Sequence, residues 1–185
     1  MTSMRRKLSA VGYAGLFAVA GAQAQNLIQN PYFDDHLTGW LYDPPGQVTW
    51  SPSVDYPAEN SGITGSMKLD GARTPSLALQ CVQIQESFDY VASMRVNSHC
   101  TGQALHVFWT DSSCTAGSSF ASATSTHADQ WDLVTLLSHP AVGAQWAIVV
   151  VENPGGSCTD PAFVDDVVFA TDIIFANGFE PPTPP

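Results

Sequence analysis

Apolar residues in this chain occur in short runs that alternate with polar residues, and Gly, Pro, Asn, Asp and Ser separate the runs. In residues 88–97, Ala92, Met94 and Val96 fall on one face of an extended chain, and polar side chains fall on the other. No segment shows the period of about 3.6 residues that marks an amphipathic helix. Short alternating runs bounded by turn residues are typical of an all-β sandwich or barrel, which is the fold class we predict.

The same runs predict where the strands lie. The phase of the alternation shifts near Cys81, which predicts a β-bulge. Residues 111–129 are small and polar, so we expect a loop or a weak edge strand there. Alternation in the run 104–110 places His106 and Phe108 on the outward face. We place the strands at residues 26–33, 48–51, 66–69, 76–85, 88–97, 104–110, 131–137, 145–152 and 162–170.

The first residues have the pattern of a cleaved secretory signal. A basic cluster at 5–7 precedes an apolar run at 8–20, and Ala22-Gln23-Ala24 fits the A-x-A rule for cleavage. The run is shorter than the roughly 20 residues that a membrane-spanning helix needs. We therefore expect a signal peptide over residues 1–24, no transmembrane segment in the mature chain, and a secreted or periplasmic location.

Removal of that leader makes the chain more acidic. The whole sequence has six Lys and Arg against 17 Asp and Glu, a net charge of −11. The mature chain keeps Lys68, Arg73 and Arg95 and all 17 acids, so its net charge becomes −14. Such a surface repels phosphate backbones and anionic lipid, which disfavours nucleic-acid binding.

The cysteine count predicts disulfides. All four cysteines lie after the leader, and an even number in an oxidising compartment indicates two bonds. Three pairings are open, and the sequence does not choose among them. A zinc site is the alternative, but the chain lacks a C-x-x-C pair. The cysteines are Cys81, Cys100, Cys114 and Cys158.

Two segments at opposite ends of the expected domain resemble one family. Residues 26–34 read N-L-I-Q-N-P-Y-F-D and are followed by T-G-W at 38–40, while residues 162–169 read A-F-V-D-D-V-V-F. This is similar to the opening and closing strands of galactose-binding-like carbohydrate-binding modules of the CenC type. Residues 65–69, G-S-M-K-L, also match the family's second strand. The resemblance implies a jelly-roll β-sandwich of two antiparallel sheets over residues 25–170.

Two positions depart from the family pattern, and one bears on a metal. Pro31 stands where the family usually has Gly, and Asp34 stands where it usually has Glu. The resemblance implies a structural Ca²⁺ between Asp34 and Asp165, with Asp166 as a close competitor. The residues alone support a role for the pair, because one aspartate of an apolar strand must point inward, where an unpaired carboxylate is costly. The alternative for Asp34 is that it only ends a strand.

Candidate sugar-binding residues combine aromatic faces with polar groups that form directed hydrogen bonds. We assign Trp40, Trp131 and Trp146 to the core. Ordinary packing or surface roles are the alternative for every remaining candidate. The predicted ligand-binding set is Trp50, Arg95, His106, Tyr42 and Tyr56.

The remaining segment is a C-terminal tail, residues 171–185, whose proline-rich end we expect to be disordered. Residues 174–180, I-F-A-N-G-F-E, resemble a tail of exported proteins from some Gram-negative bacteria. No G-x-S-x-G, H-E-x-x-H or P-loop motif is present. We expect a monomeric, non-catalytic, glycan-docking domain. The alternatives are a structural or adhesion protein that uses the sandwich for protein contacts, and a small glycan hydrolase.

Overall fold

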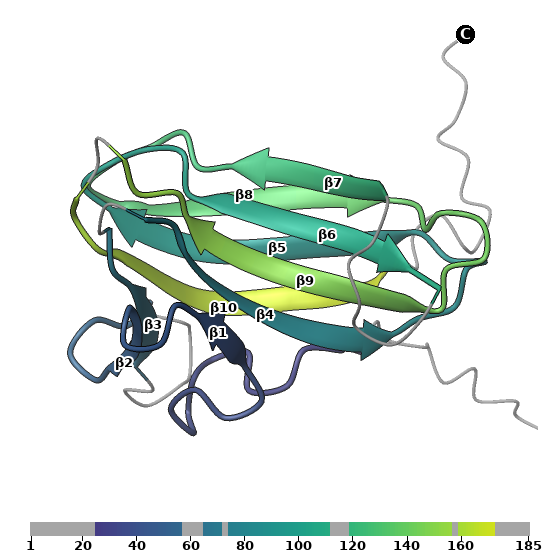
Figure 1. Cartoon of the computed structure of the whole chain (residues 1–185), viewed down its shortest axis with the longest axis horizontal. Coiled ribbons are helices and arrows are strands. Elements are labelled where there is room, and N and C mark those ends of the chain that lie inside the picture. The colour runs from purple at the N-terminus through teal and green to yellow at the C-terminus, as the bar shows by residue number, and fades with distance from the viewer. Residues whose placement is uncertain (1–24, 57–64, 72–73, 112–118, 157–158, 173–185) are drawn as a thin grey trace, which may run out of the picture.

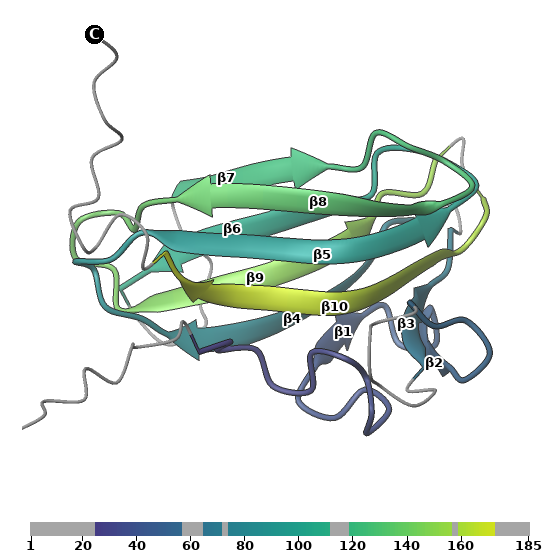
Figure 2. The same ribbon diagram turned by 180° about the vertical axis from the view of Figure 1, so that it is seen from behind.

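The computed structural model describes residues 25–56, 65–71, 74–111, 119–156 and 159–172. These residues form ten strands in two five-stranded antiparallel sheets that face one another (Figures 1 and 2). Sheet 1 has the order β1-β4-β9-β6-β7, and sheet 2 has the order β2-β3-β10-β5-β8. The strands are β1 (Leu41–Asp43), β2 (Val48–Ser51), β3 (Ser66–Leu69), β4 (Ser76–Gln83), β5 (Tyr90–Ser98), β6 (Ala104–Thr110), β7 (Ser119–Thr124), β8 (Trp131–Ser138), β9 (Trp146–Asn153) and β10 (Ala162–Thr171).

The predicted all-β sandwich is confirmed, and the alternation of side chains explains it. In β5, Ala92, Met94 and Val96 are buried between the sheets, while the residues between them are only half-buried. In β6, Leu105 and Val107 are fully buried in the same core. Burial of one face from each sheet is the main source of stability in such a sandwich.

The first predicted strand, residues 26–33, is wrong as a strand. Asn30 and Phe33 have positive φ values of 48° and 54°, which break an extended backbone into turns. The segment still runs beside β10, where the Leu27 N–H donates to the Phe169 carbonyl at 2.7 Å. Phe33 is fully buried. The apolar pattern therefore predicted burial correctly but not the backbone conformation.

The two edge strands of sheet 1 compare differently with the prediction: β1 was not predicted, and β7 was predicted in part. The three residues of β1 are all exposed, so they carry no alternation that a sequence could reveal. Residues 119–124 form β7, which is an edge strand paired only with β6. The weak-edge-strand version of the prediction for 111–129 is therefore confirmed at 119–124, and residues 112–118 lie outside the described part of the chain.

The β-bulge occurs in β10 and not near Cys81. Strand β4 pairs with β9 in unbroken register, and the apparent phase shift arises because Gln80 is buried by two hydrogen bonds to the backbone of Gln29. In β10 the register shifts between Asp165 and Val168. As a result Val167 takes the inward position. One aspartate is buried as expected, since Asp165 is 2% exposed, but it lies opposite Arg95 on the outer face of sheet 2 and not between the sheets.

Several predictions concern residues that the structure does not describe. The signal peptide, the tail beyond residue 172, Cys114 and Cys158 all lie outside the described residues. Cys81 and Cys100 are disulfide-bonded, and no described cysteine is free. The two-disulfide count stays a prediction, with the same three pairings open. No helix long and apolar enough to cross a membrane is found among the described residues.

Candidate functional site

The five residues predicted to bind sugar do not meet in one cleft. His106 lies on the outer face of sheet 1. Tyr42 belongs to the same sheet, but it pairs with the buried Ala78 and so points to the inner side at the sheet's edge. Trp50, Arg95 and Tyr56 lie on sheet 2 or in the segment that follows β2. The predicted set is thus divided between the two sheets.

Trp50 holds the N-terminal segment against sheet 2. Its ring is half-buried against the core, and its Nε1–H donates to the Phe33 carbonyl at 3.0 Å. The His36 ring lies against it, with 4.2 Å between ring centroids. A side chain at Gly65 would place its Cβ 2.7 Å from the indole nitrogen, so the close approach requires glycine. These contacts leave Trp50 a structural role.

Tyr56 is held between Arg95 and Trp131 on the outer face of sheet 2. The Arg95 guanidinium carbon lies 4.7 Å from the centre of the Tyr56 ring, a cation–π contact. The Trp131 ring meets Tyr56 edge-on at 5.6 Å between centroids. The assignment of Trp131 to the core is therefore wrong, because it is half-buried on this outer face beside Asn97.

Asp165 lies beneath the same segment. It is 2% exposed, and its carboxylate accepts the Tyr56 N–H at 3.0 Å and the Asp166 N–H at 2.7 Å. Burial raises the pKa of Asp165 to about 7; the two N–H groups oppose this rise, and the neighbouring Asp55 carboxyl adds to it. Asp165 thus fastens residues 52–56 to β10.

The predicted calcium ligands differ in burial, since Asp165 is 2% exposed. Asp34 is exposed, and no three acidic, histidine or cysteine side chains gather as a metal site among the described residues. Asp55 and Asp165 do lie together, and the fully buried Ser66 Oγ, on the neighbouring β3, has no hydrogen-bond partner. Oxygen atoms of this kind suit Ca²⁺. Calcium stays a prediction, and Asp55 adds a further carboxylate beside the predicted ligand Asp165.

The outer face of sheet 1 carries an aromatic cluster, which we call the aromatic platform: His106, Phe108, Phe120 and Glu152. Phe108 and Phe120 are cross-strand partners with ring centroids 5.4 Å apart, and His106 lies 5.9 Å from Phe108. Phe120 is 63% exposed. His106 Nε2 is 3.1 Å from a Glu152 carboxylate oxygen, while its Nδ1 is buried without a hydrogen-bond partner. The platform offers aromatic faces beside a charged group.

Only part of this platform was predicted. The outward position of His106 and Phe108 is confirmed, since alternation along one strand determines it. Phe120 lies in a segment that we left between loop and edge strand. Glu152 reaches His106 from β9, and the pairing of β6 with β9 leaves no local signal in the sequence. Trp146, the first residue of β9, also lies on the outer face of sheet 1, beside Gln83. It is half-buried there, so its assignment to the core is wrong.

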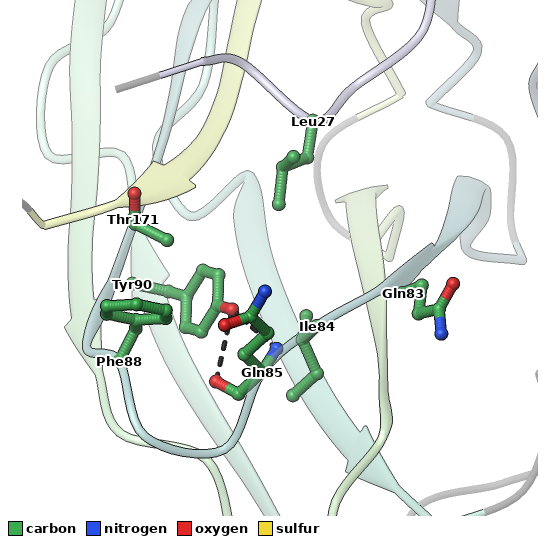
Figure 3. Close-up of a pocket in the computed structure, with 7 residues that line it drawn as sticks. All are labelled: Leu27, Gln83, Ile84, Gln85, Phe88, Tyr90 and Thr171. Atoms are coloured by element: carbon green, nitrogen blue, oxygen red, sulfur yellow. Dashed lines mark hydrogen bonds between the residues drawn. The ribbon is translucent and has the colours of Figure 1, made fainter. Parts of the chain in front are cut away.

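Hollows occur at both ends of the sandwich. One, of about 370 Å³, lies where β4 leads into β5 and β10 ends (Figure 3). Another, of about 440 Å³, lies at the far end of sheet 2. There the Asp129 carboxylate raises the pKa of the exposed His99 through a hydrogen bond and its charge. The second hollow is lined by Val54, Asn97 and Phe163 together with His99, Asp129 and Asp160.

Comparison with known proteins finds similar folds among solved structures but no similar sequence. No protein-family model matches the chain, and no curated protein matches it in sequence. A family 16 carbohydrate-binding module matches with a TM-score of 0.59 and 15% identity, over 78% of this chain and 99% of the module. A family 61 module in complex with β-1,4-galactotriose gives 0.54 and 15%, over 80% and 99%. The fold is that of a carbohydrate-binding-module jelly roll.

A third match shows the same jelly roll inside a larger protein. The enzymatically active domain of bacteriophage CBA120 tailspike protein 4 has a TM-score of 0.63 and 11% identity over 79% of this chain. The match covers 21% of the tailspike chain, so this chain spans about a fifth of that protein. At such identities the likeness shows the fold alone, and the same fold carries different functions.

Proposed function

We propose that this jelly roll is a non-catalytic domain that docks reversibly onto a glycan. The observation that carries the proposal is the aromatic platform, where the exposed ring of Phe120 continues the face of Phe108. Sugar rings present apolar C–H faces that pack on aromatic rings. Glu152 and His106 stand beside those rings, where they can bond sugar hydroxyls. Docking in this way breaks no bond.

The charge of the chain selects the kind of glycan. The mature sequence carries 17 acids against three basic residues, and the platform itself includes Glu152. An anionic polysaccharide would be repelled by this charge. We therefore propose a neutral glycan as the ligand. The structural likeness to modules of families 16 and 61 supports a sugar as the ligand class.

The proposed place of action is outside the cytoplasm. This part of the proposal rests on the leader at residues 1–24 and on the four cysteines that follow it. We propose that the domain works there as a monomer. Size-exclusion chromatography with light scattering of the purified mature protein tests the oligomeric state.

The decisive variant of the platform is Phe120→Ala. Truncation of an exposed stacking ring should weaken binding of a neutral glycan about tenfold. Leu137 is the matched control, because it is 54% exposed on the outer face of the other sheet. Calorimetric titration with a panel of neutral oligosaccharides measures both. Equal affinity of the Phe120→Ala variant and the wild type for every bound glycan would overturn the assignment of the platform.

The rival functions give different outcomes. If no soluble or insoluble glycan binds, the proposal is wrong and protein contact through the sandwich becomes the favoured function. Release of reducing sugar by the pure protein would instead identify a hydrolase. That assay matters because the fold also occurs in the enzymatically active tailspike domain.

A further inference from the structure

The pocket of about 370 Å³ at the end of the sandwich lies apart from the aromatic platform (Figure 3). Its lining comes from three segments that are distant in sequence. Leu27 precedes β1, residues 83–90 connect β4 to β5, and Thr171 ends β10. Ile84 and Tyr90 form the buried part of the lining, with 8% and 2% exposure. Such a volume lies within the usual range for small-ligand sites.

The buried part of this pocket is fixed by hydrogen bonds and ring contacts. The Tyr90 hydroxyl accepts the Gln85 backbone N–H at 2.8 Å and donates to the Gln85 carbonyl at 3.2 Å (Figure 3). The Tyr90 ring stacks on Phe169 with 5.0 Å between centroids. Leu27 is tied to the Phe169 carbonyl through its own N–H. A ligand would therefore enter a preformed site, which lowers the entropic cost of binding.

The polar groups at the mouth of the pocket are free to bind a ligand. The side chains of Gln83 and Gln85 are exposed, and their amides make no hydrogen bond to another described residue. Each amide offers both a donor and an acceptor. The Thr171 hydroxyl adds a third such group. Among the described residues that line the pocket none has a charged side chain, and burial raises the pKa of Tyr90, so its hydroxyl stays neutral.

We infer that this pocket is a second ligand site, which binds a neutral sugar unit such as the end or a branch of a glycan. The ring of Phe88 and the side chain of Leu27 would pack on the apolar face of the sugar, while the two glutamine amides bond its hydroxyls. This ligand class rests on the proposed function, whereas the pocket itself does not depend on the platform.

Charge next to the pocket excludes acidic sugars. Glu86, Asp89 and Asp172 follow the lining residues directly along the chain. Glu86 accepts the Gly143 N–H at 3.0 Å, and Asp89 lies 2.7 Å from a nitrogen of His139. These carboxylates favour a neutral monosaccharide over the corresponding uronic acid.

The test uses the full mature protein and free monosaccharides. Nuclear magnetic resonance follows the side-chain amide signals of Gln83 and Gln85 during titration with galactose, glucose and xylose, and with galacturonic acid as the acidic probe. Gln85→Met keeps the backbone bonds to Tyr90 but removes the amide, so the Kd should rise about fivefold. Gln130→Met is the matched control, since Gln130 is exposed and precedes β8 at the other end of the sandwich.

Each outcome decides the inference. We expect at least one neutral sugar to shift both amide signals, galacturonic acid to shift neither, and Gln130→Met to bind as the wild type does. The inference is wrong if no neutral sugar moves these signals, or if Gln85→Met leaves the Kd unchanged. Phe120→Ala separates this result from the platform: glycan binding that depends on Phe120 without any response of the pocket signals retains the proposed function and removes only the second site.

Discussion

Asp165 is the single residue whose ionisation should most affect the stability of the fold. Its folded-state pKa of about 7 lies above the ordinary 3.8. The folded chain therefore holds this proton more tightly than the unfolded chain does. The free energy of unfolding should fall as the pH rises between these two values, by at most about 4 kcal/mol, and should level off above pH 7.

The substitution Asp165→Asn should remove this pH dependence, because asparagine keeps the shape of the side chain without its charge. Urea denaturation at several pH values measures the free energy of unfolding. Asp34→Asn is the control, since Asp34 is exposed and should leave the wild-type profile unchanged. Parallel profiles for the wild type and Asp165→Asn would show that Asp165 does not titrate in this range.

Calcium should have the opposite effect on Asp165, because a bound cation favours its ionised form and burial favours its protonated form. A cation between Asp55 and Asp165 favours the ionised carboxylates. At pH values above the pKa of Asp165, added Ca²⁺ should therefore raise the midpoint of urea denaturation. At pH values below that pKa, Ca²⁺ should have a smaller effect on the midpoint. If neither Ca²⁺ nor a chelator changes the midpoint at any pH, the calcium prediction is wrong.

The tryptophans show what a sequence can and cannot reveal about single residues. Trp40 was assigned to the core, and its 4% exposure confirms that role. Trp131 was assigned there as well, yet it lies against Tyr56 on an outer face. Alternation gives the face of a side chain within one strand. It does not reveal the loop that later covers that face, because this contact joins residues far apart in sequence.

At the scale of elements, the segment before β1 takes the place of a regular edge strand beside the second half of β10. Asn26 joins the two: its side chain donates to the Val167 carbonyl at 3.0 Å and accepts the Phe169 N–H at 2.9 Å. The Asn26 side-chain amide thus replaces two backbone hydrogen bonds of the sheet, at a part of β10 that does not pair with β3. The sequence pattern predicted that this segment is buried, but positive φ values at Asn30 and Phe33 prevented a strand.

The substitution Asn26→Ala should release this segment from β10. Three part-buried hydrogen bonds are lost, two to β10 and one from the Ile28 N–H, so stability should fall by about 1–3 kcal/mol. Hydrogen exchange should become faster at the Phe169 amide. At the buried Val149, in the centre of sheet 1, the exchange rate should change only as much as the loss of global stability requires. Unchanged exchange at Phe169 would mean that Asn26 does not hold the segment in solution.

At the scale of the whole molecule, the strand order decides which residues can act together. The prediction of two antiparallel sheets came from the family resemblance, and the observed strand order confirms it. The physical reason is that many short alternating strands can bury their apolar faces only when one sheet packs on another. The predicted binding residues were divided because β6 belongs to sheet 1 and β5 to sheet 2. Arg95 and His106 therefore point away from each other on opposite outer faces. A sequence pattern gives inward and outward positions, but the assignment of each strand to a sheet depends on long-range pairing.

The net charge leads to a prediction for the whole molecule. The net charge is −11 for the whole sequence and −14 for the chain without the predicted leader, so the domain should bind a neutral glycan more tightly than its uronate or sulfated counterpart, by at least about threefold at low ionic strength. Added salt should reduce this difference, because screening weakens repulsion between exposed charges while stacking on Phe120 is largely unaffected. Calorimetric titration of matched neutral and anionic oligosaccharides over a range of NaCl concentrations measures both effects. Tighter binding of the anionic partner at low salt would show that local basic groups outweigh the overall charge, and Arg95, whose guanidinium lies over Tyr56, would be the first residue to substitute.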